Sequence, residues 1–209
     1  MERLNAIYTE RRECQDCHKC IRECPVKAIR VQDTYAKVVP ELCIMCGNCV
    51  MACPSSAKQV RNDLPDAKAL LASGRKVVVS IAPSFAAQFP GVRPAQLIHA
   101  LKQLGFSAIS ETALGAQQVS ASVVSLMRSE PKQIWISTAC PVVVDLVAKY
   151  HPECQPHLSG ILSPLLTHCR MLREHFGNEV AIVFIGPCIA GLQPNLLPQT
   201  DQPPYRVPV

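Results

Sequence analysis

The chain has 209 residues, of which 48% are hydrophobic, and a formal net charge of +5 with histidine neutral. This length favours one or two domains, and the apolar fraction is enough for a buried core, which excludes a disordered chain. No run of about 18 apolar residues and no cleavable leader pattern occurs, so we expect a soluble, cytoplasmic protein with no membrane association.

Eight of the twelve cysteines lie in two blocks that repeat each other 29 residues apart: CQDCHKCIRECP from Cys14 and CIMCGNCVMACP from Cys43. Both blocks have the C-x2-C-x2-C-x3-C-P spacing of bacterial two-cluster ferredoxins, in which three nearby thiolates bind one 4Fe-4S cubane and the fourth binds the other. Cytoplasmic thiols stay reduced, which also favours metal over disulfides. The spacing therefore predicts two 4Fe-4S clusters. The expected ligands are Cys14, Cys17, Cys20 and Cys53 for cluster 1, and Cys43, Cys46, Cys49 and Cys24 for cluster 2.

Two other metal groups fit part of this pattern. Cys14 to His18 also matches the C-x-x-C-H pattern of covalent haem attachment, but the second block has Gly47 where the histidine stands. Zinc is the other alternative for closely spaced cysteines. Basic residues near the first block have no interleaved aromatic residues, so we expect no nucleic-acid binding.

The composition changes after the second block, and we place a domain boundary near residue 62. Residues 1–62 are expected to form an α+β ferredoxin-like two-cluster domain, and residues 63–209 an α/β parallel-sheet lobe with a proline-rich tail from about 192. Apolar periodicity and glycine or proline boundaries predict the elements of this lobe. The expected strands are 76–83, 107–111, 133–137 and 180–186, and the expected helices are 94–106, 119–126, 141–150 and 163–177.

Cys140 and Cys188 each follow a predicted strand. Ligands in open α/β sheets bind beyond the carboxyl ends of the strands, so a shared site is possible, and two inert thiols in turns are the alternative. Cys169 lies on the apolar stripe of its helix, which indicates a buried, unreactive thiol. Cys154 lies between two histidines in H-x2-C-x2-H spacing, where an incidental loop is favoured over a metal site.

Five motifs in order carry a resemblance to a known family: the paired cysteine blocks, SIAPSFAAQF, ETALGA, STACP and GPC. The chain resembles the large subunit of iron-only hydrogenases, and within it the hydrogenase-like sensory branch. The resemblance implies that Cys140 and Cys188 are two of the four ligands of the 4Fe-4S part of the active-site cluster, a possible partial third cluster.

The chain also departs from that family. Catalytic members have a proton-relay cysteine at the position of Ala139, and members often have a lysine at the position of Gly191. The other two ligands belong to a C-x3-C motif in a second lobe, which we expect to be missing before Val209. We therefore assign no catalytic residue, and the hydrogenase active-site cluster is not expected in this chain alone.

Three functions follow as hypotheses. The first is an iron-sulfur electron-transfer or redox-sensing protein whose two clusters serve a hydrogenase-like domain. The second is a fragment or subunit of a working hydrogenase, a related oxidoreductase only if a second lobe completes it. The third is a scaffold for iron-sulfur cluster assembly. The expected partner is a redox protein, the missing lobe or a regulatory domain, and an exposed apolar face would favour self-association.

Overall fold

The structure is a computed structural model that describes residues 5–192 and 205–208. These residues divide into two compact units. We call residues 5–61, 142–153 and 189–192 the cysteine unit, and residues 62–141, 154–188 and 205–208 the sheet unit. The predicted boundary near residue 62 stays a prediction of domain organisation.

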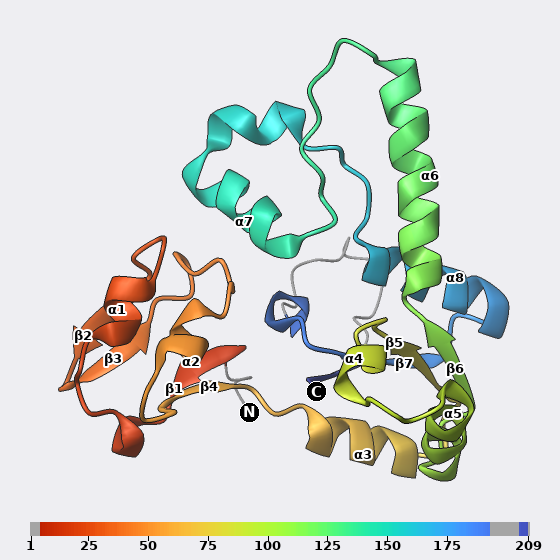
Figure 1. Ribbon diagram of the computed structural model, residues 1–209, viewed down its shortest axis with the longest axis horizontal. Coiled ribbons are helices and arrows are strands. Elements are labelled where there is room, and N and C mark those ends of the chain that lie inside the picture. The colour runs from red at the N-terminus through yellow and green to blue at the C-terminus, as the bar shows by residue number, and fades with distance from the viewer. Residues whose placement is uncertain (1–4, 193–204, 209) are drawn as a thin grey trace. The chain divides into compact units, whose positions relative to one another are not determined.

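The cysteine unit is built from two copies of one motif, as the sequence repeat predicts (Figure 1). Its strands form two antiparallel pairs, β1 with β4 and β2 with β3. Each copy therefore contributes one strand to each pair, so neither copy can form its sheets alone. Its elements are β1 (Ile7–Thr9), η1 (Arg11–Glu13), α1 (Lys19–Glu23), β2 (Ile29–Gln32), β3 (Tyr35–Val38), α2 (Asn48–Ala52) and β4 (Lys58–Val60). Two elements from later in the chain also belong to it: η3 (Ile189–Leu192) and α7 (Pro141–Tyr150), except for the first residue of α7.

The repeat extends to backbone conformations that most residues avoid. His18 and Gly47, 29 residues apart, both have positive φ (57° and 82°) and precede α1 and α2. Left-handed geometry at this position turns the chain sharply before each helix, and glycine adopts it without strain. The same turn can therefore present the cysteines of both blocks.

Two segments from the second half of the sequence pack within the cysteine unit. In α7, Lys149 Nζ donates to the Cys43 carbonyl at 2.6 Å and Tyr150 Oη donates to the Leu42 carbonyl at 2.7 Å. A Cβ added to Gly47 would lie 2.8 Å from Ile189 Cδ1, the first residue of η3. Both segments thus contact the second cysteine block.

The sheet unit has a four-stranded sheet in the order β6-β5-β7-β8, with every neighbouring pair parallel. Ser163 caps α8 through its side chain, which accepts from the Leu166 N–H, and Gly177 ends the helix with φ 92°. The elements are α3 (Leu64–Ala72), β5 (Val77–Ile81), α4 (Phe85–Gln88), α5 (Pro94–Gln103), β6 (Ala108–Glu111), α6 (Ala113–Ser129), η2 (Pro152–His157, from its third residue), α8 (Pro164–Phe176), β7 (Ala181–Gly186) and β8 (Tyr205–Pro208).

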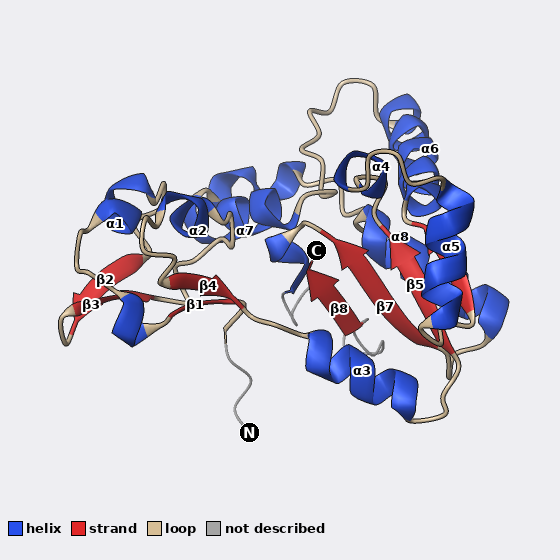
Figure 2. Cartoon of the chain, turned by 60° about the horizontal axis from the view of Figure 1, so that its bottom comes forward, coloured by secondary structure: helices blue, strands red, loops and turns tan. Residues whose placement is uncertain are grey.

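Helices cover both faces of this sheet (Figure 2). On one face, Leu70 of α3 and Leu101 of α5 pack on Val79 and neighbouring strand residues. On the other, Leu172 of α8 packs on Val78. Alternate residues of β5 are buried on opposite faces, which explains its continuous apolar sequence. The predicted fold class, a ferredoxin-like cysteine domain and an α/β parallel-sheet lobe, is confirmed.

Two predictions about the lobe need correction. The strand predicted over residues 133–137 is wrong: Ile134 is 73% exposed, and the segment makes a single bridge, from Ile136 to Leu158. An apolar run cannot show by itself whether a neighbouring strand is free to pair. The expected proline-rich tail also differs, because Tyr205–Pro208 form β8 beside β7. A proline is tolerated there because β8 is an edge strand. Residues 193–204 lie outside the described part.

The helices of the described residues are all too short or too polar to cross a membrane.

Candidate metal centre

Four cysteines of the predicted cluster 1 set lie near one another. Cys20 is buried in the core of the cysteine unit, Cys14 is half-buried and Cys17 is exposed. Burial raises the pKa of Cys20, and the charges of Cys53, Cys14 and Cys17 raise it further. Three thiols from the first block therefore converge with the last cysteine of the second block.

The predicted cluster 2 set converges in the same way. Burial raises the pKa of Cys49 to about 12, with added effects from Cys43 and Cys46. Burial likewise raises the pKa of Cys43, the Met45 N–H opposes this, and the charges of Cys46 and Cys24 add to it. Mutual repulsion of this kind favours neutral thiols until a cation joins them.

Backbone N–H groups are directed at the sulfurs. The Ala28 N–H donates to Cys24 Sγ at 3.2 Å, and the Met45 N–H donates to Cys43 Sγ at 3.3 Å. Burial alone would raise the pKa of Cys53, but hydrogen bonds from Lys58, Ser55 and Ala57 lower it. These donors stabilise negative sulfur, so the two sets fit the thiolate ligands of 4Fe-4S clusters.

The described residues contain no candidate site for a single metal ion. Within residues 5–192 and 205–208, no group of three or more His, Cys, Asp or Glu side chains could hold one ion. His151 Nδ1 lies 3.2 Å from Glu153 Oε1, and His157 Nδ1 lies 3.2 Å from the Ile134 carbonyl oxygen. The histidines that flank Cys154 therefore have other partners.

Cys140 and Cys188 occupy different positions from one another. Cys188 lies just beyond β7, as predicted, and is exposed. Cys140 is also exposed, but it directly precedes α7 and follows no strand of the sheet. The argument that placed both cysteines beyond strands therefore holds only for Cys188. Their role as ligands stays a prediction. Cys169 is 1% exposed, in agreement with a buried thiol.

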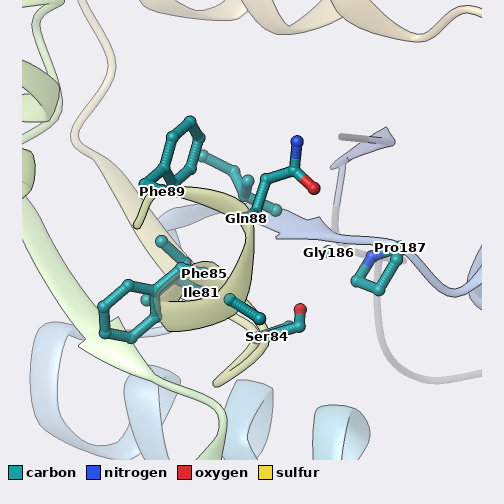
Figure 3. A pocket seen from close by; sticks show the side chains of 10 residues that line it. Ile81, Ser84, Phe85, Gln88, Phe89, Gly186 and Pro187 are labelled. Carbon is teal, nitrogen blue, oxygen red and sulfur yellow. The ribbon is translucent and has the colours of Figure 1, made fainter. Parts of the chain in front are cut away.

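A cavity of about 190 Å³ lies at the carboxyl ends of β5 and β7, next to Cys188 in sequence (Figure 3). Its walls are mainly apolar. The polar side chains labelled there belong to Gln88, in α4, and to Ser84, the residue before α4. Gly186 lines it without a side chain because an added Cβ would lie 2.5 Å from the Phe184 ring. The position is where open α/β sheets bind ligands.

Three residues near the cysteine sets were not identified from the sequence. Lys58 lies just before the predicted domain boundary in a polar stretch, and it is 3% exposed. Lys149 and Tyr150 were predicted only as the end of a helix. In the structure, Lys149 donates to the carbonyl of Cys43 in the second block, and Tyr150 donates to the carbonyl of Leu42, the residue before that block. No local pattern could have signalled them, because each depends on which segment the residue packs against.

Two protein families match the sequence. The family described as iron only hydrogenase large subunit, C-terminal domain, matches residues 75–193. The 4Fe-4S dicluster domain matches residues 6–62. The second match agrees with the two 4Fe-4S clusters predicted from the cysteine spacing.

Individual curated relatives match a short part of the chain. A subunit of an ion-translocating oxidoreductase complex of Methanosarcina acetivorans is 46% identical over 48 residues, 23% of this chain and 18% of the relative. An uncharacterized ferredoxin of Methanocaldococcus jannaschii is 44% identical over 46 residues, 21% of this chain and 28% of the relative. The chain thus spans less than a third of either curated relative.

A solved FeFe-hydrogenase structure, which concerns stepwise assembly of the H cluster, shares the fold. The TM-score is 0.53 at 22% sequence identity, over 70% of this chain and 44% of that one. This similarity supports the order of a ferredoxin-like domain followed by a parallel-sheet lobe.

Proposed function

Because the chain belongs to the family of the iron only hydrogenase large subunit, C-terminal domain, and begins with a 4Fe-4S dicluster domain, we propose that it is an electron-transfer or redox-sensing protein. In this proposal its two clusters exchange electrons with a site in the hydrogenase-like lobe. When bound, each 4Fe-4S cluster supplies one-electron redox chemistry.

The proposal assigns four cysteines to each cluster. Convergence of the first three cysteines of each block with the last cysteine of the other block supports the assignment. N–H donors to Cys24, Cys43 and Cys53 would favour the more negative, reduced form. Cluster 1 takes Cys14, Cys17, Cys20 and Cys53, and cluster 2 takes Cys43, Cys46, Cys49 and Cys24.

One observation carries the functional proposal: the segments that directly follow Cys140 and Cys188 both pack on the second cysteine block. Helix α7 begins one residue after Cys140 and contacts Leu42 and Cys43 through its last two residues. Ile189 follows Cys188 and contacts Gly47 closely. The segments that follow both candidate ligands in the sequence therefore belong to the same packed unit as the cluster 2 cysteines.

The two halves of the repeat then have different tasks. Cys17 of the first block is exposed, and Arg22 donates from its guanidinium group to the Cys17 carbonyl oxygen at 3.4 Å. We assign this half to an external redox partner and the second half to the lobe. The relative from Methanosarcina acetivorans is a subunit of an oxidoreductase complex, which supports a protein partner. We place the protein in the cytoplasm, because a reducing compartment keeps eight closely spaced cysteines available as metal ligands.

Hydrogen turnover by these residues alone is not proposed. The family resemblance puts the proton-relay cysteine at the position of Ala139, which has no titratable group. Gly191 is buried in η3 and offers no ammonium group where other members have lysine. Cluster assembly on this chain is a weaker alternative, since no observation favours a transferable cluster.

The test is anaerobic reconstitution followed by a count of iron and sulfide. We expect about eight of each per chain, and Cys20→Ala should lose about half of the iron. Cys169→Ala is the matched control, because this cysteine is also buried but lies in α8 of the sheet unit. A count near four in the unsubstituted protein, or zinc without sulfide, would refute the two-cluster assignment. The reduced protein should also pass electrons to a ferredoxin-dependent acceptor, without evolving hydrogen.

A further inference from the structure

A single lysine is enclosed in the core of the cysteine unit. Lys58 of β4 is 3% exposed, and its Nζ donates to Thr9 Oγ1 at 2.6 Å and to the Ala36 carbonyl at 2.5 Å. Ala36 belongs to the same buried core as Cys20 and Cys49. The ammonium group therefore lies inside the part of the unit that holds the cysteines, and not on its surface.

The sequence repeat shows that the fold does not require a lysine here. The position 29 residues earlier is Ile29, which is buried in the same core with 5% exposure. An apolar residue therefore fills this position in the first copy of the motif. The second copy replaces it with a cation, which breaks the symmetry of the repeat at one buried position.

A buried cation needs compensation. Both oxygen atoms that accept from Lys58 are neutral, and no carboxylate pairs with it among residues 5–192. Enclosing an ammonium group without a counter-charge costs several kcal/mol. Something negative must therefore lie nearby in the working protein.

Among the described residues of the surrounding core, the cysteine sulfurs are the groups that can carry this negative charge. The Lys58 ammonium is close enough to Cys20 and Cys49 for its charge to act on both thiols, and Cys20 and Cys49 belong to different predicted clusters. In addition, the backbone N–H of Lys58 bonds to the sulfur of Cys53. Lys58 therefore interacts with cysteines of both predicted ligand sets.

We propose that Lys58 is a shared internal counter-charge that raises the reduction potentials of both 4Fe-4S clusters and weakens the repulsion between them. This inference rests on the cluster assignment of the proposed function. A thiolate-bound cubane becomes more negative by one charge on reduction, so a fixed cation nearby stabilises the reduced form. Thr9 and the Ala36 carbonyl hold the ammonium group in place without neutralising it.

The experiment is an anaerobic redox titration of the reconstituted full chain, followed by electron paramagnetic resonance. Lys58→Met should make reduction of both clusters roughly tenfold less favourable, about 59 mV for each one-electron couple. Lys58→Arg keeps the charge and should stay near the unsubstituted protein. Lys37→Met is the matched control, because it removes an exposed lysine from β3 of the same unit and should change neither potential.

The outcomes separate this inference from the cluster assignment. If the unsubstituted protein does not bind about eight irons, the assignment itself fails. If it does, and Lys58→Met has unchanged potentials or only the same change as Lys37→Met, the counter-charge is refuted. If Lys58→Met binds less iron than the unsubstituted protein and Lys58→Arg binds the same amount as the unsubstituted protein, the requirement for a positive charge is supported. If neither variant binds both clusters, the shape of the side chain is what matters, and the inference is overturned.

Discussion

The two units of this protein are stabilised in different ways. The sheet unit has long helices and a core of aliphatic strand residues, of which Val77, Val78, Val79 and Val183 are almost completely buried. The cysteine unit has strands of three or four residues and five-residue helices α1 and α2, and Cys20, Cys24 and Cys49 are part of its core. We therefore expect the sheet unit to fold on apolar burial alone and the cysteine unit to depend on its clusters.

The largest expected effect comes from removal of iron. An anaerobic chelator should unfold the cysteine unit, because metal binding supplies folding free energy to a small thiol-rich core and the empty thiols would be left crowded. Hydrogen exchange should show loss of protection in α1 and α2, with β5 and β7 still protected. The comparison between the units would fail if β5 exchanged as fast as α2, or if α2 stayed protected without iron.

The second prediction concerns a buried polar network in the sheet unit. His168 is 1% exposed, with Nδ1 2.8 Å from Ser80 Oγ and Nε2 2.8 Å from Ser110 Oγ. Replacing it with leucine leaves both hydroxyls without this partner, and should lower the free energy of unfolding by about 1–3 kcal/mol. The measurement is thermal or urea unfolding followed by the fluorescence of Trp135, the single tryptophan.

The same histidine gives a pH dependence. Burial lowers the pKa of His168, so the folded state binds the proton less tightly than the unfolded state. The contribution to stability is complete above the unfolded pKa of about 6.5 and is lost as the pH falls through the folded pKa. His168→Leu should remove this dependence, and His175→Leu, an exposed histidine of the same helix, should not. Equal pH profiles for the two variants would contradict the role of His168.

The sequence was sufficient to predict most of this fold, because its strongest signals are local. Cysteine spacing defined the repeat, and apolar periodicity with end signals such as Ser163 and Gly177 defined α8. The failure over residues 133–137 has the opposite origin. Ile136 bonds to the loop around Leu158 instead of to the sheet, and that pairing depends on contacts distant in sequence.

The candidate site, like the fold, was predicted only where its signals are local in the sequence. The thiols could be assigned from their spacing, but their surroundings could not. Lys58 follows a polar stretch and has a charged side chain, so its burial becomes visible only when β4 is paired with β1. Similarly, the contact of Tyr150 with Leu42 joins residues 108 positions apart. Residues that modify a centre through packing are therefore harder to predict than the residues that form it.

The smallest expected effect tests the connection between α7 and the second cysteine block. Tyr150→Phe removes the donor to the Leu42 carbonyl and keeps the ring, so α7 should open about fivefold more often, equivalent to about 1 kcal/mol. Burial and the charges of Cys24 and Cys43 raise the pKa of Tyr150, so this contribution is present below the unfolded pKa of about 10 and is lost as the pH rises through the folded pKa. Hydrogen exchange of the α7 amides at neutral pH measures the opening.

The matched control is Tyr35→Phe, which changes a half-buried tyrosine in β3 beneath Arg11 and should leave α7 unchanged. If both variants open α7 equally, the hydroxyl of Tyr150 does not hold the helix against the second cysteine block.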